Sequence, residues 1–157
     1  MKIINLGSHS GAAYPDLRFY PSVFDHILEG VAALLLIAVW LSAFYFHANP
    51  QAVGAETSYG WMMAGCSLFT FLLLGASAYL PMRFYGLPFR LTDGNAGMQC
   101  MLAVRVVRML NILLNALLLV CLWAVANFRV MTLAMPVFGV LMAATFIAYY
   151  VLAYKYR

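Results

Sequence analysis

The chain has 157 residues, of which 66% are hydrophobic and only 9% are charged. Soluble domains carry about 25% charged residues, and a chain of this length cannot bury so much apolar surface in one water-soluble core. We therefore expect lipid to surround most of it. The formal net charge of +4 is placed at the ends of apolar runs rather than on one polar face, which excludes a nucleic-acid-binding domain.

The first 25 residues differ from the rest in composition. Glycines and serines open the chain, and a mixture of aromatic residues, prolines and Arg18 follows, which is typical of a segment at the lipid headgroups. No continuous apolar core lies in the first twenty residues, so no cleavable signal peptide is expected. We predict a polar, interfacial lead over residues 1–25 and one transmembrane domain over residues 26–157.

Four apolar runs in the second region are long enough to cross a bilayer, which takes about 20 residues. Pro81 stops the second run, and Pro136 falls in the first turn of the fourth, where proline is tolerated. Thr92 or Asp93 is a candidate cap for the third helix. The sequence predicts an all-α integral membrane protein, an antiparallel bundle of four transmembrane helices. The predicted spans are residues 27–46, 61–80, 105–128 and 132–153.

The basic residues predict an orientation. With four spans, both termini and the middle loop share one side, and eight of the nine Lys and Arg residues fall there. Only Arg129 falls on the other side. Because Lys and Arg collect in cytoplasmic loops, we expect both termini to be cytoplasmic.

A polar stripe runs along the third span. Arg105, Arg108, Asn111 and Asn115 lie within a narrow arc of a helix, and asparagine in hydrocarbon must find a hydrogen-bond partner. The stripe is a candidate polar path or ligand contact. Alternatively, the asparagines link helices and the arginines extend to the headgroups.

Acidic residues stand at the start of the first span, at the same depth as these arginines. Asp25 and Glu29 share a helix face, and both complement the dipole of the helix N-terminus. We predict an ion pair between Glu29 and Arg108 or Arg105, because pairing relieves two charges near lipid. His26 raises the alternative of a proton-linked switch.

Nothing in the sequence predicts a metal or a cofactor. The His26-x-x-Glu29 step occurs once, whereas a di-metal bundle needs such a motif on two helices. Cys66, Cys100 and Cys121 have neither metal-type nor redox-type spacing, which favours a packing role. No catalytic constellation is found, so a non-enzymatic protein is expected.

The loop between the first two spans faces outward in this orientation. It carries His47, Asn49 and Glu56, which together form a candidate contact for a cationic or peptide ligand. The plainer interpretation is a solvated loop that holds turn residues.

Two segments resemble a known family. The pattern His47-x-Asn49 followed by Gly54, Glu56 and Tyr59-Gly60 resembles the signature of the bacterial membrane domain of unknown function 1648. The segment from Leu87 to Cys100 is similar to the loop before the third span in small stand-alone members. Here, however, Leu87, Gly94 and Cys100 replace the usual Tyr, Glu and aromatic residue.

The resemblance implies a function. The family domain is best known from the N-terminal part of immunity and signalling proteins against the Sdp killing factor. We therefore expect a binding, sensing or toxin-immunity protein of the bacterial inner membrane, with an extracytoplasmic peptide or protein ligand. A small transporter or accessory subunit that uses the polar stripe is the alternative, and homo-oligomerisation is left open.

Overall fold

The structure is a computed structural model that describes residues 3–5, 17–50, 57–81, 84–85, 87–88, 95–125 and 128–156. In this part of the chain, four helices are each long and apolar enough to cross a membrane. The four predicted helices are thus confirmed as helices. They are α1 (Val23–Ala48), α3 (Thr57–Ser77), α4 (Ala96–Ala124) and α5 (Phe128–Lys155).

Helix α1 has capping residues at both of its ends. The Ser22 hydroxyl accepts from the Asp25 backbone N–H at 3.4 Å, and an Asp25 carboxylate oxygen accepts from the Ser22 backbone N–H at 2.9 Å. This reciprocal capping box satisfies two N–H groups that a helix N-terminus leaves open. At the other end, the Asn49 side chain donates to the carbonyl of Tyr45 at 3.1 Å.

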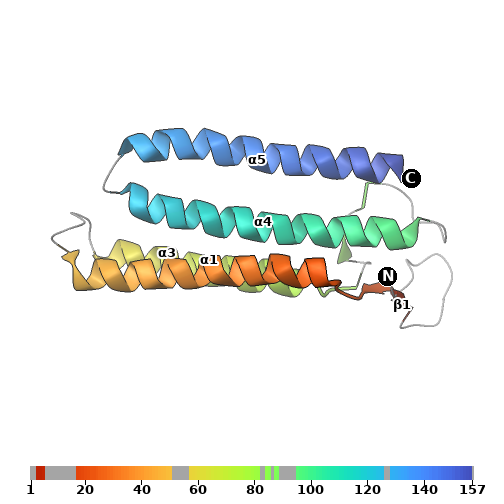
Figure 1. Cartoon of the computed structure of the whole chain (residues 1–157), viewed down its shortest axis with the longest axis horizontal. Coiled ribbons are helices and arrows are strands. Elements are labelled where there is room, and N and C mark those ends of the chain that lie inside the picture. Colours follow the sequence, from red (N-terminus) through yellow and green to blue (C-terminus); the bar gives the residue numbers. More distant parts are fainter. Residues whose placement is uncertain are drawn as a thin grey trace.

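The helices run alternately up and down, and they form a three-helix core with one helix outside it. Helices α1, α3 and α4 contact one another, whereas α5 packs mainly against α4. Figure 1 shows α5 on the far side of α4 from α1 and α3. The predicted bundle is therefore open, with α5 at its edge. Lipid is as apolar as leucine, so a helix in a membrane need not be enclosed by its neighbours.

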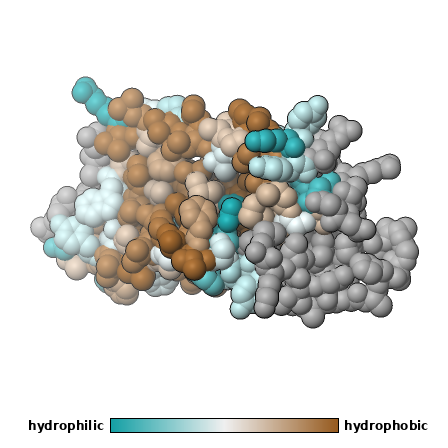
Figure 2. Space-filling view, turned by 45° about the vertical axis from the view of Figure 1, so that its right-hand side comes forward, coloured by the Kyte–Doolittle hydropathy of each residue, from teal (hydrophilic) through white to brown (hydrophobic). Residues whose placement is uncertain are grey.

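The apolar surface agrees with this arrangement. In the most apolar stretch of α5, none of the residues is buried inside the protein. Leu34 of α1 and Leu133 of α5 are 67% and 70% exposed, values that would be costly for leucines in water. Hydrophobic side chains dominate the face drawn in Figure 2. A surface of this kind suits contact with lipid on most sides.

Helix α4 begins at Ala96 rather than near Arg105, where the third span was predicted to start. The added turns contain Gln99, which is fully buried against α5. Its side-chain amide donates to the carbonyls of Ala153 and Tyr156 at 2.8 and 3.3 Å. Ala153 lies in the last turn of α5 and Tyr156 follows it, where backbone acceptors lack partners within the helix. Gln99 therefore fastens the end of α5 to the start of α4.

Three smaller differences concern the segments around the helices. The lead contains two short antiparallel strands, β1 (Ile3–Asn5) and β2 (Leu17–Phe19), in addition to the expected polar chain. Helix α5 starts at Phe128, so Arg129 lies in its first turn rather than in a link, and Pro136 lies inside the helix rather than in its first turn. The predicted caps of α4, Thr92 and Asp93, lie outside the described residues.

Candidate functional site

Arg108 of α4 lies between two carboxylates of α1. Its Nη1 is 3.1 Å from Asp25 Oδ1 and its Nη2 is 2.6 Å from Glu29 Oε1. Its Nε also donates to Glu29 Oε1, at 3.1 Å. The side chains of Arg108 and Asp25 are 3% and 0% exposed, and that of Glu29 is 28% exposed. Arg108 thus joins α4 to α1 through charge-assisted hydrogen bonds to Glu29 and an ion pair with Asp25.

Helical spacing brings a second arginine to the same place. Asp25 and Glu29 are one helical turn apart on α1, and Arg105 lies one turn before Arg108 on α4. The Nε of Arg105 is 3.3 Å from Asp25 Oδ1. We call Asp25, Glu29, Arg105 and Arg108 the ionic cluster. Its two positive and two negative formal charges cancel, which removes most of the cost of placing them beside lipid.

Tyr79 connects α3 to the ionic cluster. It follows the last turn of α3, and its hydroxyl donates to Glu29 Oε1 at 2.6 Å. The Arg108 guanidinium carbon is 5.7 Å from the centre of the Tyr79 ring, within the range of a cation–π contact. Desolvation of the ring, with the hydrogen bond to Glu29 and its negative charge, raises the pKa of Tyr79 above its ordinary value. The hydroxyl therefore stays protonated and keeps donating at neutral pH.

His26 touches the ionic cluster from outside. Its Nδ1 is 3.4 Å from Glu29 Oε2, and its side chain is 61% exposed. An exposed imidazole at this distance adds little to the stability of the folded chain. The contact nevertheless places a titratable group beside Glu29, as a proton-linked switch would need.

Deeper in the bundle, the two asparagines of the polar stripe link α3 to α4. The Ser67 hydroxyl donates to Asn115 Oδ1 at 2.5 Å, and Asn111 Nδ2 donates to the carbonyl of Phe71 at 3.4 Å. Asn115 Nδ2 donates to Asn111 Oδ1 at 2.8 Å. Both asparagine side chains are buried. Their amides thus act as interhelical links, which is one of the two alternatives that the sequence left open.

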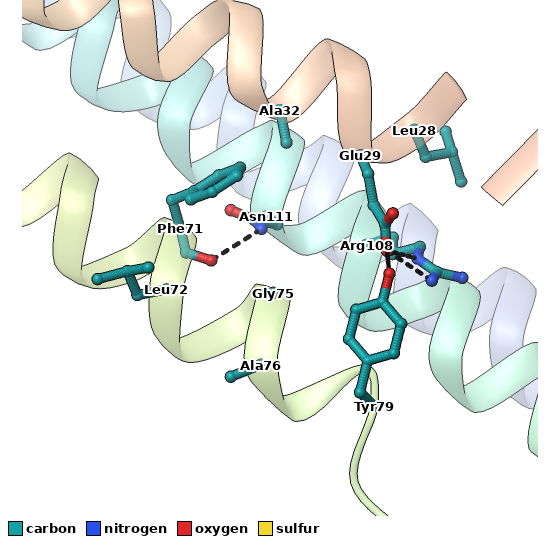
Figure 3. Close-up of a pocket in the computed structure, with 10 residues that line it drawn as sticks. All are labelled: Leu28, Glu29, Ala32, Phe71, Leu72, Gly75, Ala76, Tyr79, Arg108 and Asn111. Atoms are coloured by element: carbon teal, nitrogen blue, oxygen red, sulfur yellow. Dashed lines mark hydrogen bonds and ion pairs between the residues drawn. The ribbon is translucent and has the colours of Figure 1, made fainter. Parts of the chain in front are cut away.

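A cavity of about 290 Å³ lies where α1, α3 and α4 meet beside the ionic cluster. Figure 3 shows Tyr79 and Arg108 converging on Glu29 at one end, with apolar side chains around the rest. Gly75 and Ala76 of α3 leave this space, because neither has a side chain that reaches across it. The lining consists of Leu28, Glu29, Ala32, Phe71, Leu72, Gly75, Ala76, Tyr79, Arg108 and Asn111.

The residues of the predicted outward site have other roles where the structure describes them. His47 is exposed, and its ring centre lies 5.7 Å from that of Trp61 on α3. Asn49 caps the end of α1. Glu56 lies outside the described residues. The structure therefore brings Glu29, Arg105, Arg108 and Asn111 to the cavity end of the bundle, and it leaves His47 and Asn49 at the opposite end of α1.

Sequence reasoning missed three members of the site. Asp25 was expected only to complement the helix dipole, yet it caps α1 and pairs with both arginines. Tyr79 and Gly75 fall inside the second predicted span, residues 61–80, and neither was predicted to belong to the site. The available signal was the charge count, because one carboxylate cannot neutralise two neighbouring arginines.

Comparisons with known proteins give no further information about the site: no family model, curated protein or solved structure matches this chain. The resemblance to the domain of unknown function 1648 therefore stays a prediction from the residues quoted above. Among the described residues, no three His, Cys, Asp or Glu side chains gather as metal ligands would. The functional argument depends on the ionic cluster and the cavity.

The ionic cluster predicts strong coupling between Glu29 and Arg108. Arg108→Gln should destabilise the protein by about 3–5 kcal/mol, because it removes a cationic partner from the buried Asp25 carboxylate and from Glu29 at once. Glu29→Gln should cost less, since Glu29 is partly exposed. The double variant should fall short of the sum of the single losses by roughly 0.5–3 kcal/mol.

Unfolding of the purified protein in detergent, followed by circular dichroism, measures these losses. Lys155→Gln, an exposed charge at the end of α5, is the matched control and should change stability by less than about 0.5 kcal/mol. Strictly additive losses for Glu29 and Arg108 would contradict the coupling.

Proposed function

We propose that this chain is a small multi-pass protein of the bacterial inner membrane that binds or senses an amphipathic ligand without converting it. The observation that carries the proposal is the cavity between α1, α3 and α4, which is apolar along most of its wall and charged at one end. Ligand sites are typically concave and mostly apolar, with a few converging polar groups. The four apolar helices support the membrane location.

The arrangement of the charged groups favours binding over catalysis. Glu29 Oε1 already accepts from Tyr79 and from two nitrogens of Arg108, and Asp25 holds the capping box and both arginines. Groups that hold one another in place are suited to a fixed recognition surface. A general acid or base must instead reach the proton that it transfers.

The family resemblance supports a more specific version of the proposal, in which the protein confers immunity to an extracytoplasmic peptide. Such a ligand would arrive at the end of the bundle that carries His47 and Asn49. The cavity lies nearer to the other end, where the ionic cluster joins α1 to α4. The two candidate sites can therefore be separated by mutation.

A second candidate function is an accessory subunit of a membrane complex. The position of α5 favours it, because α5 packs mainly on α4 and leaves most of its surface free for lipid or a partner helix. Transport along the polar stripe is supported less well. The amides of Asn111 and Asn115 are engaged in hydrogen bonds between and within α3 and α4.

The proposed orientation has both termini in the cytoplasm. Strand β1 and the last turn of α5 lie at the same end of the molecule (Figure 1). The positive-inside rule favours a cytoplasmic location for this end, since the sequence predicts eight of the nine basic residues on the side of the termini. In a background without native cysteines, Gln51→Cys should react with an impermeant thiol reagent in intact cells.

Lys2→Cys should react with the reagent only after the cells are permeabilised. Both cysteines are placed outside the four helices. As the control, denatured protein should react with the reagent equally at either position. Labelling of Lys2→Cys in intact cells would reverse the proposed orientation.

The cavity is tested by filling it. Gly75→Leu should weaken saturable binding of naphthalene at least tenfold, because the new side chain occupies the space beside Phe71 and Asn111. Gly75→Ala is the matched control: an added Cβ would lie 3.9 Å from the nearest atom, Asn111 Nδ2, which is an ordinary contact. Fluorescence titration in detergent, corrected for partition into protein-free micelles, measures binding.

The same titration separates the cavity from the outward loop. Simultaneous replacement of His47, Asn49 and Glu56 by alanine should leave naphthalene binding unchanged. If that variant loses binding while Gly75→Leu retains it, the ligand site belongs to the outward loop and the cavity proposal fails.

A further inference from the structure

The size of the cavity limits what part of a ligand it can hold. An apolar protein cavity of about 150 Å³ accommodates benzene, and this cavity is about 290 Å³. It therefore suits an apolar group of roughly twice that size, such as a medium-length alkyl chain or a pair of fused rings. Six of its ten lining residues are Leu28, Ala32, Phe71, Leu72, Gly75 and Ala76, which offer no side-chain hydrogen bond.

The polar end of the cavity offers an acceptor. Glu29 Oε1 receives three hydrogen bonds, from the Tyr79 hydroxyl and from Arg108 Nε and Nη2. In the described part of the chain, Glu29 Oε2 has only the contact with exposed His26 at 3.4 Å. A carboxylate oxygen has two lone pairs and can accept more. Because Glu29 lines the cavity, its Oε2 is a candidate acceptor at this end, and it calls for a donor from the ligand.

The charge around this acceptor disfavours an anion. Arg108 is held by Asp25 and Glu29, and Arg105 is held by Asp25, so the ionic cluster has no excess positive charge. An anionic headgroup would stand beside the Glu29 carboxylate without a matching cation, and like charges at such short range repel. A hydroxyl or an ammonium group meets no such repulsion.

We propose that the cavity binds an amphiphile whose apolar chain occupies the space between α1, α3 and α4 and whose hydrogen-bond-donating head, a hydroxyl or an ammonium group, donates to Glu29 Oε2. This assignment rests on the proposed binding function and adds the chemistry of the head. Its source is either an aminolipid of the bilayer or a free amphiphile that enters from it.

The test uses three probes with the same chain and different heads: decanol, decylamine and decanoate. Each competes with naphthalene for the purified protein in phosphatidylcholine nanodiscs at neutral pH. Decanol and decylamine should displace naphthalene, and decanoate should need at least a tenfold higher concentration. Gly75→Leu should abolish the displacement signal, whereas Gly75→Ala should keep the same order of affinities.

A charge variant inverts the expected order. Glu29→Gln removes the negative charge and gives the ionic cluster a net positive charge, so decanoate should gain on decylamine by tenfold or more. Equal binding of all three probes by the unmodified protein, or a preference for decanoate, overturns the assigned head chemistry even if the charge variant fails to fold. In that case naphthalene still binds and the cavity remains a site. If naphthalene itself does not bind saturably, the proposed function fails as well.

The two sources are separated by changing the bilayer. If phosphatidylethanolamine in the nanodisc competes with decylamine in proportion to its fraction, the occupant is an aminolipid. If decylamine affinity is the same in both bilayers, the occupant is a free amphiphile. Each result agrees with a ligand whose headgroup donates a hydrogen bond, and each identifies the source of that ligand.

Discussion

The structure depends on the pairing of the charged side chains that point into the helix bundle. Arg108 is 3% exposed, and a lone guanidinium at that position would be a buried charge without compensation. Two carboxylates on one face of α1 supply the compensation, and they meet Arg108 from consecutive turns of the same helix. Because the guanidinium is planar and its donors are fixed in direction, the pairing sets both the rotation of α4 and its height against α1.

This pairing also accounts for the cavity. The Glu29 side chain is drawn towards α4 by Arg108 and towards the end of α3 by Tyr79, so it closes one end of the space between the three helices (Figure 3). The asparagine links hold α3 and α4 together one to two turns further along. Between these polar connections, Gly75 and Ala76 leave volume that lipid or a ligand can occupy. Most of these polar groups thus hold the helices together. Glu29 Oε2 is the acceptor that we propose for recognition.

The helices of this protein were predictable because hydropathy and length report on lipid contact directly. The first turns of α4 lie outside the predicted span, since the stretch from Asn95 to Gln99 holds two amides and a glycine and a hydropathy window does not include it. The hydrogen-bond partner of Gln99 lies in the last turn of α5, which is distant in the sequence. The same limit hid the position of α5. Helix α5 is apolar on every side, so its sequence contains no stripe that shows which of its faces meets α4.

The site was predictable to the extent that its members lie on one helix face. Arg105, Arg108, Asn111 and Asn115 share a stripe that helical periodicity defines. Asp25 was underestimated because a carboxylate at a helix N-terminus has a sufficient local explanation in the capping box. Tyr79 could not be found from local sequence, since its hydroxyl acts across a distance of fifty residues along the chain.

The central claim is that Arg108 is held by Glu29 and Asp25. Solid-state NMR in lipid bilayers can measure it, through the dipolar coupling between ¹⁵N-labelled arginine guanidinium and ¹³C-labelled side-chain carboxyl groups. With Arg108 Nη2 2.6 Å from Glu29 Oε1 and Nη1 3.1 Å from Asp25 Oδ1, strong dephasing of both carboxyl signals is predicted. Arg108→Lys should remove most of the dephasing at Glu29, since Asp25 is the only carboxylate that Arg105 contacts in the described part of the chain. Undiminished carboxyl signals from the unmodified protein would contradict the account.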